Sequence, residues 1–145
     1  MRIYMDNCCF NRPFDNQTQK KIELETGAKL FIQEKIIKGY FDLVWSYILS
    51  YENSMNPFRE RQKAIEAWRE IAAIDCDENS DIIAIAEKIE RLGVKAKDAL
   101  HLACAIYAEC EYFITTDTKL LKKSFEGIKI VDPIQLVKIV EDDEL

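Results

Sequence analysis

Short apolar runs alternate along this chain with longer stretches in which apolar residues recur at helical spacing. The short runs are typical of buried strands, and they occupy residues 2–6, 40–46, 112–116 and 128–131, while a short edge strand fits residues 72–76. The periodic stretches predict helices over residues 19–38, 57–73, 82–92 and 96–110, with shorter helices after residue 46, at residues 119–124 and from residue 132. This alternation predicts an α/β domain whose mostly parallel sheet is covered on both faces.

Several residues mark the expected limits of these helices. Gly93 follows a periodic stretch and should end it. Asn56 is a good N-cap and Pro57 suits the first helical position, so the next helix should begin there. The polar segment 7–16 is expected to be a loop. Residues 96–110 are apolar almost all round, so this helix should be buried on most faces.

The composition is that of an ordinary globular protein. The 145 residues suffice for one domain with its own core, expected at residues 1–140 and followed by an acidic tail at 141–145. Hydrophobic residues make up 48% and charged residues 32% of the chain, which excludes a disordered class. No apolar run is long enough to span a bilayer and no signal segment precedes the first strand, so we expect a cytoplasmic protein without membrane contact.

The net charge and the cysteine content exclude other classes. Of the net charge of -6, the tail contributes -4 through Glu141, Asp142, Asp143 and Glu144, so the rest of the chain does not repel nucleic acid strongly. The five cysteines form an odd set without CxxC spacing, which argues against a disulfide framework. A single histidine and the lack of Cys/His spacing exclude a zinc finger.

Four carboxylates are expected to meet at one end of the sheet. Asp6 and Asp117 follow strands, and the carboxyl ends of neighbouring parallel strands share one crevice. Asp98 begins the apolar helix, and Glu52 lies on a helical stripe of apolar residues. Like charges this close resist ionisation unless a cation neutralises them. Because hard oxygen ligands suit Mg²⁺ or Mn²⁺, the sequence predicts a site for one of these ions.

Each of these carboxylates also has a purely structural interpretation. Asp98 can cap its helix, and Asp117 can cap the turn that follows its strand. Asp6 can form an Asx turn, and Glu52 can point into water. A fold that places all four at one end of the sheet favours the metal site over four separate coincidences. His101 lies one turn after Asp98, and we expect it to be buried with its ring satisfied by a backbone carbonyl.

Four short motifs occur in a fixed order along the chain. They are Ile3-Tyr4-Met5-Asp6, Glu52 after Val44-Trp45-Ser46, Lys97-Asp98-Ala99-Leu100-His101-Leu102-Ala103 and Phe113-Ile114-Thr115-Thr116-Asp117, and the segment from Asp6 to Asp15 adds a fifth similarity. This ordered set resembles PIN-domain ribonucleases, most closely the small single-domain members that act as toxins in toxin-antitoxin pairs. The resemblance runs nearly from end to end.

The resemblance implies a three-layer α/β/α sandwich with a mostly parallel sheet in the order 3-2-1-4-5. It implies one or two Mg²⁺ or Mn²⁺ ions, with Asp6 and Asp98 as direct ligands, Asp117 as a ligand or a carrier of bound water, and Glu52 as a ligand or proton acceptor. Thr115 would orient Asp6 or the bound water. It further implies hydrolysis of RNA to a 5′-phosphate and a 3′-hydroxyl, a protein antitoxin and a homodimer.

Basic residues near the expected site are candidates for contacts with RNA phosphates. The candidates are Arg12, Lys97 and Lys119, and Lys95, Lys122 and Lys123 lie in turns at the same end of the sheet. For each lysine, an ordinary role on the surface is the competing interpretation.

Two other functions remain open on the sequence. A receiver-type signalling domain also binds magnesium with acids at strand ends, and Asp75 and Asp77 keep it open, although Asp6 has no adjacent acid and Asp98 would have no role. A non-catalytic PIN-fold binding subunit is the second alternative. The segment after Asp6 lacks both the glycines of a Rossmann nucleotide site and the second aspartate of a haloacid-type phosphatase.

Overall fold

Five parallel strands form one sheet in the computed structural model, which describes residues 1–144. The sheet has the order β3-β2-β1-β4-β5, as expected. Its strands are β1 (Arg2–Met5), β2 (Asp42–Ser46), β3 (Ile74–Cys76), β4 (Tyr112–Ile114) and β5 (Lys129–Val131). Runs of apolar residues form these strands because helices bury the sheet on both faces. In the central strand β1, the residues from Ile3 to Met5 are fully buried.

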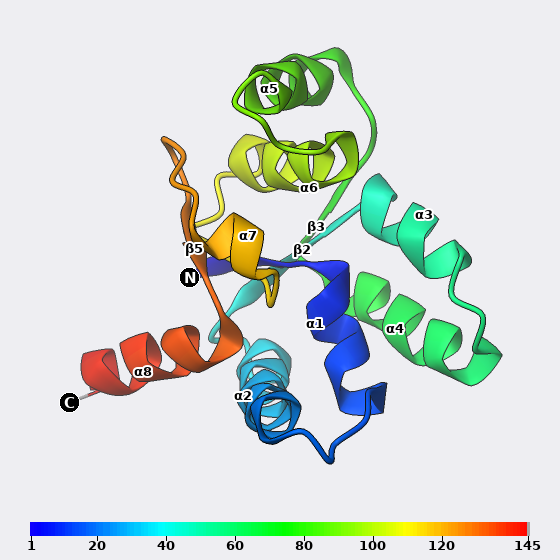
Figure 1. Cartoon of the computed structure of the whole chain (residues 1–145), viewed down its shortest axis with the longest axis vertical. Helices are drawn as coiled ribbons and strands as arrows, with labels where there is room; N and C mark the ends of the chain where they lie inside the picture. The colour runs from blue at the N-terminus through cyan, green and yellow to red at the C-terminus, as the bar shows by residue number, and fades with distance from the viewer. Residues whose placement is uncertain (145) are drawn as a thin grey trace.

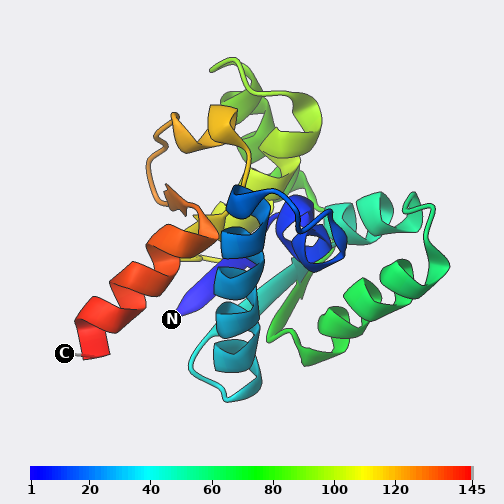
Figure 2. The same cartoon turned by 60° about the horizontal axis from the view of Figure 1, so that its bottom comes forward.

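Two layers of helices enclose the sheet (Figure 1). The helices are α1 (Asn7–Asn11), α2 (Lys20–Ile37), α3 (Tyr47–Ser54), α4 (Arg59–Ile71), α5 (Ser80–Glu90), α6 (Ala96–Tyr107), α7 (Thr118–Leu121) and α8 (Pro133–Glu144), with a 3-10 turn, η1, at Arg12–Phe14. Helices α5 and α6 pack together on one face, and α2 packs against α8 on the other (Figure 2). The three-layer α/β/α sandwich is therefore confirmed.

The strand order excludes a receiver-type domain. Receiver-like sheets have the order 2-1-3-4-5, in which the first strand pairs with the third. Here β1 pairs with β2 and β4 instead. Asp75, which had kept the receiver interpretation open, lies in the edge strand β3 and pairs with Arg69 at 2.7 Å. The receiver alternative is wrong for this chain.

Several expected boundaries differ from the structure. Helix α6 ends at Tyr107 and α7 ends at Leu121, both earlier than expected. Segment 7–16, expected to be a loop, contains α1 and η1, because the Asp6 side chain caps α1 by accepting a hydrogen bond from the Asn7 N–H at 2.8 Å. Helix α4 begins at Arg59, because the side chain of Asn56 accepts from the Phe58 N–H at 3.1 Å and forms a turn before the helix.

Helix α8 extends into the acidic tail that the sequence predicts. Helix α8 includes the first four residues of the expected tail as far as Glu144, and Leu145 lies outside the described residues. The last helical carboxylates with described side chains, Glu141 to Asp143, are exposed. Across residues 1–144, none of the helices combines the length and the apolar character that a bilayer crossing requires.

Candidate metal site

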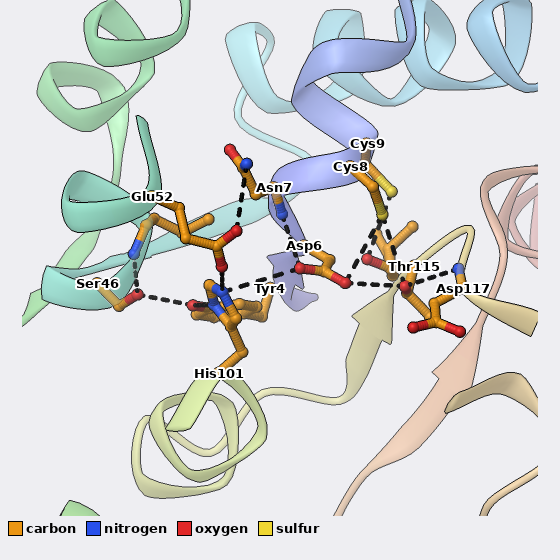
Figure 3. Close-up of polar contacts among 12 residues, drawn as sticks. Tyr4, Asp6, Asn7, Cys8, Cys9, Ser46, Glu52, His101, Thr115 and Asp117 are labelled. Carbon is orange, nitrogen blue, oxygen red and sulfur yellow. Dashed lines mark hydrogen bonds and ion pairs between the residues drawn. The ribbon is translucent and has the colours of Figure 1, made fainter. Parts of the chain in front are cut away.

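Asp6 lies at the carboxyl end of β1, in the middle of the candidate site (Figure 3). The strand is central in the sheet, so only 8% of Asp6 is exposed. Its Oδ1 accepts the hydrogen bond that caps α1, and its Oδ2 accepts from Thr115 Oγ1 at 2.9 Å. The Cys8 thiol lies 3.6 Å from the same Oδ2. These donors fix the orientation of the carboxylate before any cation binds, and Thr115 takes the position beside Asp6 that the resemblance implied.

Glu52 reaches the site from helix α3. Ser46 caps this helix at the end of β2, which places Glu52 at the same edge of the sheet as Asp6. Glu52 Oε1 contacts Nε2 of His101, and Asn7 Nδ2 lies 3.4 Å from Glu52 Oε2. His101 Nε2 also lies 3.9 Å from Asp6 Oδ1. Oxygen or nitrogen atoms of Asp6, Glu52 and His101 therefore lie within 4.8 Å of one another.

A buried series of hydrogen bonds leads from Glu52 into the core. His101 Nδ1 lies 2.5 Å from the Tyr4 hydroxyl, which lies 2.6 Å from Ser46 Oγ. Ser46 Oγ accepts from the Leu49 N–H at 3.2 Å. We call the side chains of Glu52, His101, Tyr4 and Ser46 the relay. His101 is buried, as expected, but side chains rather than a backbone carbonyl satisfy its ring, so that part of the expectation is wrong.

The protonation of the relay follows from the charges around it. Burial alone would raise the pKa of Glu52, but the hydrogen bond and the charge of His101 outweigh it and lower this pKa. An ionised Glu52 accepts hydrogen bonds only, so the proton lies on His101 Nε2. Burial raises the pKa of Tyr4 well above its usual value, so the hydroxyl that hydrogen-bonds His101 Nδ1 stays protonated. His101 thus orients Glu52, and neither ring nitrogen has a free lone pair for an ion.

Asp98 and Asp117 lie on the other side of Asp6. Asp98 is in the first turn of α6, and Asp117 caps α7 by accepting from the Lys119 N–H at 2.8 Å. Asp117 N–H donates to Thr115 Oγ1 at 3.1 Å, so one hydroxyl links Asp117 to Asp6. Figure 3 shows Glu52 and Asp117 on opposite sides of Asp6. Both Asp98 and Asp117 are half-buried, which differs from the interior position expected for Asp98.

Other carboxylates repel Asp98, and His101 offsets their effect only in part. Burial raises the pKa of Asp98, and the charges of Asp6 and Asp117 raise it further. Within residues 1–144, no side chain donates a hydrogen bond to its carboxylate. This repulsion among oxygen donors is the physical signature of a site that a cation completes, and the hard carboxylate set fits Mg²⁺ or Mn²⁺. Among the residues described, Asp6 and Glu52 lie close enough to share one ion, whereas Asp98 and Asp117 lie outside that compact group and line the neighbouring cavity.

A cavity of about 460 Å³ opens beside Asp98 and Asp117. We call it the lysine cavity, because Lys95, Lys119 and Lys123 also line it. Cations next to a site that binds a metal ion suit the oxygens of a phosphate group. Lys119, a predicted contact for RNA, is therefore in a position to meet a phosphate that reaches the carboxylates.

The two other predicted RNA contacts lie outside this cavity. Lys97 is exposed and close enough to Glu52 for its charge to help lower the pKa of that carboxyl. Arg12 pairs with Asp15 at 2.9 Å and with buried Glu25 at 3.4 Å, so its guanidinium is engaged within the fold.

The relay and Asn7 were not recognised in the sequence. The strand period of two places Tyr4 and Asp6 on one face of β1, and the helical spacing places Asp98 and His101 on one side of α6. These spacings were a usable signal for Tyr4 and His101. Asn7 had no such signal, because its position depends on helix α1, which was expected to be a loop.

Comparison with known proteins gives one family and a set of similar folds. The family model of the PIN domain matches residues 22–126, a range that contains Glu52, Asp98 and Asp117. No curated protein sequence matches the chain.

Several solved structures share the fold. VapBC2 from Rickettsia felis, bound to a DNA fragment from their promoter, has a TM-score of 0.59 at 12% identity, with 91% of this chain and 98% of that chain covered. DNA-bound VapBC from Salmonella typhimurium gives 0.58 at 16% identity over 92% and 98% of the two chains. VapBC-1 from nontypeable Haemophilus influenzae gives 0.58 at 18% identity over the same shares. The family match over more than half of the sequence, on a fold with this strand order, shows that the chain belongs to the PIN domain family.

Proposed function

We propose that this chain is a divalent-metal-dependent endoribonuclease that hydrolyses RNA phosphodiester bonds. The observation that carries the proposal is the cluster of four carboxylates at one edge of a PIN-domain sheet, in which Asp6 and Asp117 raise the pKa of Asp98. Ordinary surface acids repel one another too weakly to need a counter-ion. Here the repulsion is concentrated beside lysines that suit a phosphate, which favours a hydrolytic site for a phosphodiester.

Each carboxylate has a role in the proposed reaction. Asp6, Asp98 and Asp117 would hold Mg²⁺ or Mn²⁺, and the hydrogen bonds to Asp6 keep its oxygens in place for this purpose. The bound ion supplies Lewis acidity and makes water a stronger nucleophile near neutral pH. Glu52, kept ionised by His101, either joins the ligands or accepts the proton of the attacking water. Thr115 links the Asp6 carboxylate to the Asp117 backbone N–H through its hydroxyl.

The lysine cavity supports RNA as the class of substrate. Lys95, Lys119 and Lys123 would hold phosphate oxygens on the side of Asp98 and Asp117, where the repulsion among the acids would otherwise keep an anion away. Cleavage would leave a 5′-phosphate and a 3′-hydroxyl, as the resemblance to PIN-domain ribonucleases implies.

We further propose that the chain is the toxin of a toxin-antitoxin pair and forms a homodimer. The resemblance to the small toxin-type members supports this, and similar folds occur in the VapBC structures. Helix α2 exposes Leu24, Leu30 and Ile37 by 51%, 52% and 66%, which is apolar surface of the kind that protein partners cover. Induced expression in a bacterial host should then arrest growth, and Asp6→Asn should abolish the arrest.

Cleavage of labelled single-stranded RNA by the purified chain tests the activity. We expect cleavage with Mg²⁺ or Mn²⁺, loss of cleavage with chelator, and loss with Asp6→Asn. The matched control is Asp42→Asn, which makes the same chemical change at an exposed position at the start of β2. Asp42→Asn should keep full activity.

Two outcomes would contradict the proposal. Cleavage that survives both chelation and Asp6→Asn would exclude a metal-dependent mechanism at this site. A folded protein that binds Mn²⁺ and RNA but cleaves no RNA would favour the non-catalytic PIN-fold binding subunit instead.

A further inference from the structure

A second cavity lies beside Glu52, on the side of the site away from Asp117. Its volume is about 250 Å³, and its walls come from α1, from α3 with the turn that follows it, and from α4. Three asparagines and an arginine line it together with apolar side chains: Asn7, Asn11, Asn56, Arg61, Met55 and Phe58. We call it the amide cavity. It shares Glu52 with the proposed active site, so a ligand that occupies it lies next to the reacting centre.

The three asparagines form a connected wall. Asn56 Nδ2 lies 3.3 Å from Asn11 Oδ1, Asn11 Nδ2 donates to the Asn7 carbonyl at 3.1 Å, and Asn7 Nδ2 reaches Glu52. Asn7 Oδ1 is buried and accepts no hydrogen bond from the residues that the structure describes. An unsatisfied buried acceptor typically costs about 1–3 kcal/mol, and a ligand N–H would satisfy it once the Asn7 side chain turns toward the cavity.

A flat, exposed surface forms the opposite part of the cavity. The Phe58 ring is 56% exposed, and the Arg61 guanidinium lies over it at 4.4 Å from the ring centroid. Arg61 also lies 5.2 Å from the Phe14 ring and donates from Nη2 to the Phe14 carbonyl at 3.0 Å. The guanidinium is therefore held in place. A planar cation and an aromatic ring together make a platform for a stacked base.

We propose that the amide cavity binds one unpaired nucleobase of a single-stranded RNA, next to the bond that is cleaved. The base stacks on the face of Phe58 that Arg61 leaves uncovered, and its edge meets the amides of Asn7 and Asn56. The amide cavity is of a size that suits a group smaller than a drug-sized ligand. It has no lysine and includes one carboxylate, which disfavours a phosphate. The lysine cavity would hold phosphates on the other side, so the two cavities give the RNA a direction across the site. The inference rests on the proposed RNA substrate.

Binding of labelled RNA to the inactive Asp6→Asn protein tests the subsite without cleavage. In this background we expect Phe58→Ala to weaken the binding of single-stranded RNA about 5- to 150-fold, which corresponds to the loss of about 1–3 kcal/mol of stacking. Phe58→Leu should give a similar loss, because it keeps apolar area and removes the aromatic face, and Phe58→Trp should retain binding. Tyr40→Ala is the matched control, since Tyr40 is 63% exposed and lies before the amino end of β2, whereas the candidate site lies beyond the carboxyl ends of the strands.

An abasic scan identifies the nucleotide that occupies the cavity. Oligonucleotides that lack one base at successive positions should bind the Asp6→Asn protein more weakly at one position near the cleaved bond. At that position alone, Phe58→Ala should add no further loss, because the base that it would stack is already missing.

Three outcomes would overturn this inference. The first is unchanged RNA binding by Phe58→Ala. The second is a loss of binding free energy from Phe58→Ala that simply adds to the loss from the abasic position. The third is no binding of single-stranded RNA at all. If Phe58→Ala instead releases a co-purified protein while RNA binding is unchanged, the cavity is a protein interface. Metal-dependent cleavage by wild type that persists in Phe58→Ala with unchanged binding would leave the proposed nuclease function intact and refute only the subsite.

Discussion

The two sides of Asp6 carry the same kind of charge in different ways. On one side, Glu52 is held by His101 and its pKa is lowered. On the other, Asp98 receives no side-chain hydrogen bond within residues 1–144, and burial together with Asp6 and Asp117 raises its pKa. One carboxylate has a hydrogen-bond partner built into the fold, and the other has none and is repelled by neighbouring carboxylates.

This difference suggests how the site divides its tasks. A carboxylate that the protein already orients and keeps ionised is ready before substrate or ion binds, as a proton acceptor must be. A carboxylate left uncompensated is destabilised until a cation arrives, so the free energy of ion binding includes relief of that repulsion. In the proposed mechanism, the side of Glu52 would provide orientation, and the side of Asp98 and Asp117 would provide affinity for the ion.

The largest expected effect is the loss of RNA cleavage in the Asp98→Asn variant. Removing a ligand from the uncompensated side should lower kcat/KM by roughly 1,000-fold, or about 4 kcal/mol of transition-state stabilisation. Single-turnover cleavage of RNA with saturating Mn²⁺ measures this loss, and Asp42→Asn serves as the control. A rate within tenfold of wild type would show that Asp98 holds no essential ion.

The next effect is on stabilisation by the ion. Mn²⁺ at about 100 times its Kd should raise the free energy of unfolding of wild type by roughly 2.7 kcal/mol. Asp98→Asn should remove most of this gain, because it weakens ion binding at the same concentration. Tyr4→Phe should keep most of it, since Tyr4 is not among the proposed ligands. Urea unfolding with Mn²⁺ or chelator measures the difference, and equal gains in Asp98→Asn and wild type would end the proposed division of tasks.

The third effect concerns the relay itself. Tyr4→Phe removes the hydroxyl that donates to His101 Nδ1 and should destabilise the ion-free protein by about 1–3 kcal/mol. The matched control is Tyr112→Phe, because the Tyr112 hydroxyl makes no hydrogen bond with residues 1–144. The free energy of unfolding of that variant should stay within about 0.5 kcal/mol of the wild-type value.

The ring nitrogens of His101 give a direct readout of the relay. The chain contains one histidine, so its imidazole ¹⁵N signals need no assignment among several rings. We expect a proton on Nε2 and none on Nδ1 in wild type, with and without Mg²⁺. A signal that shows Mg²⁺ bound to Nε2 would instead make His101 a ligand and contradict its positioning role.

The part of the fold that depends on hydrophobic pattern could be predicted from the sequence. The alternation of runs gave an α/β domain, and the strand order came from the resemblance. Asp6 and Asp117 were placed at strand ends by local rules, because Asp6 directly follows β1 and Asp117 comes three residues after the end of β4. Thr115 follows β4, two residues before Asp117, so its contact with Asp6 could also be predicted.

What could not be predicted depends on contacts between distant elements. His101 meets Glu52 and Tyr4 across separations of 49 and 97 residues, and no local pattern shows which atoms satisfy a buried ring. The helix α1 was missed because Asp6 was interpreted as a metal ligand or an Asx-turn residue and not as a helix cap. The structure shows the cap, and the amide cavity depends on that helix because Asn7 and Asn11 come from it.

The smallest expected effect is on the stability of the ion-free protein, and here the two sides should differ in sign. Glu52→Gln should lower the free energy of unfolding at pH 7 by about 1 kcal/mol, because it replaces a charge-assisted hydrogen bond to His101 by a neutral one. Asp98→Asn should raise it by about 0.5 kcal/mol, because it removes a repelled charge while losing a favourable position in the first turn of α6. Urea unfolding in chelator measures both.

The pH dependence follows from the two pKa shifts. The folded pKa of Glu52 is lowered, so its contribution to stability is present above its unfolded pKa of about 4.3 and is lost as pH falls through the folded value. The folded pKa of Asp98 is raised, so its contribution to the stability of wild type is fully present below its unfolded pKa of about 3.9. That contribution is lost as pH rises through the folded pKa. Both differences from wild type should therefore shrink on acidification, from opposite signs. If Asp98→Asn were destabilised at pH 7 as Glu52→Gln is, the protein itself would compensate both carboxylates, and the cation would lose its special relation to the Asp98 side.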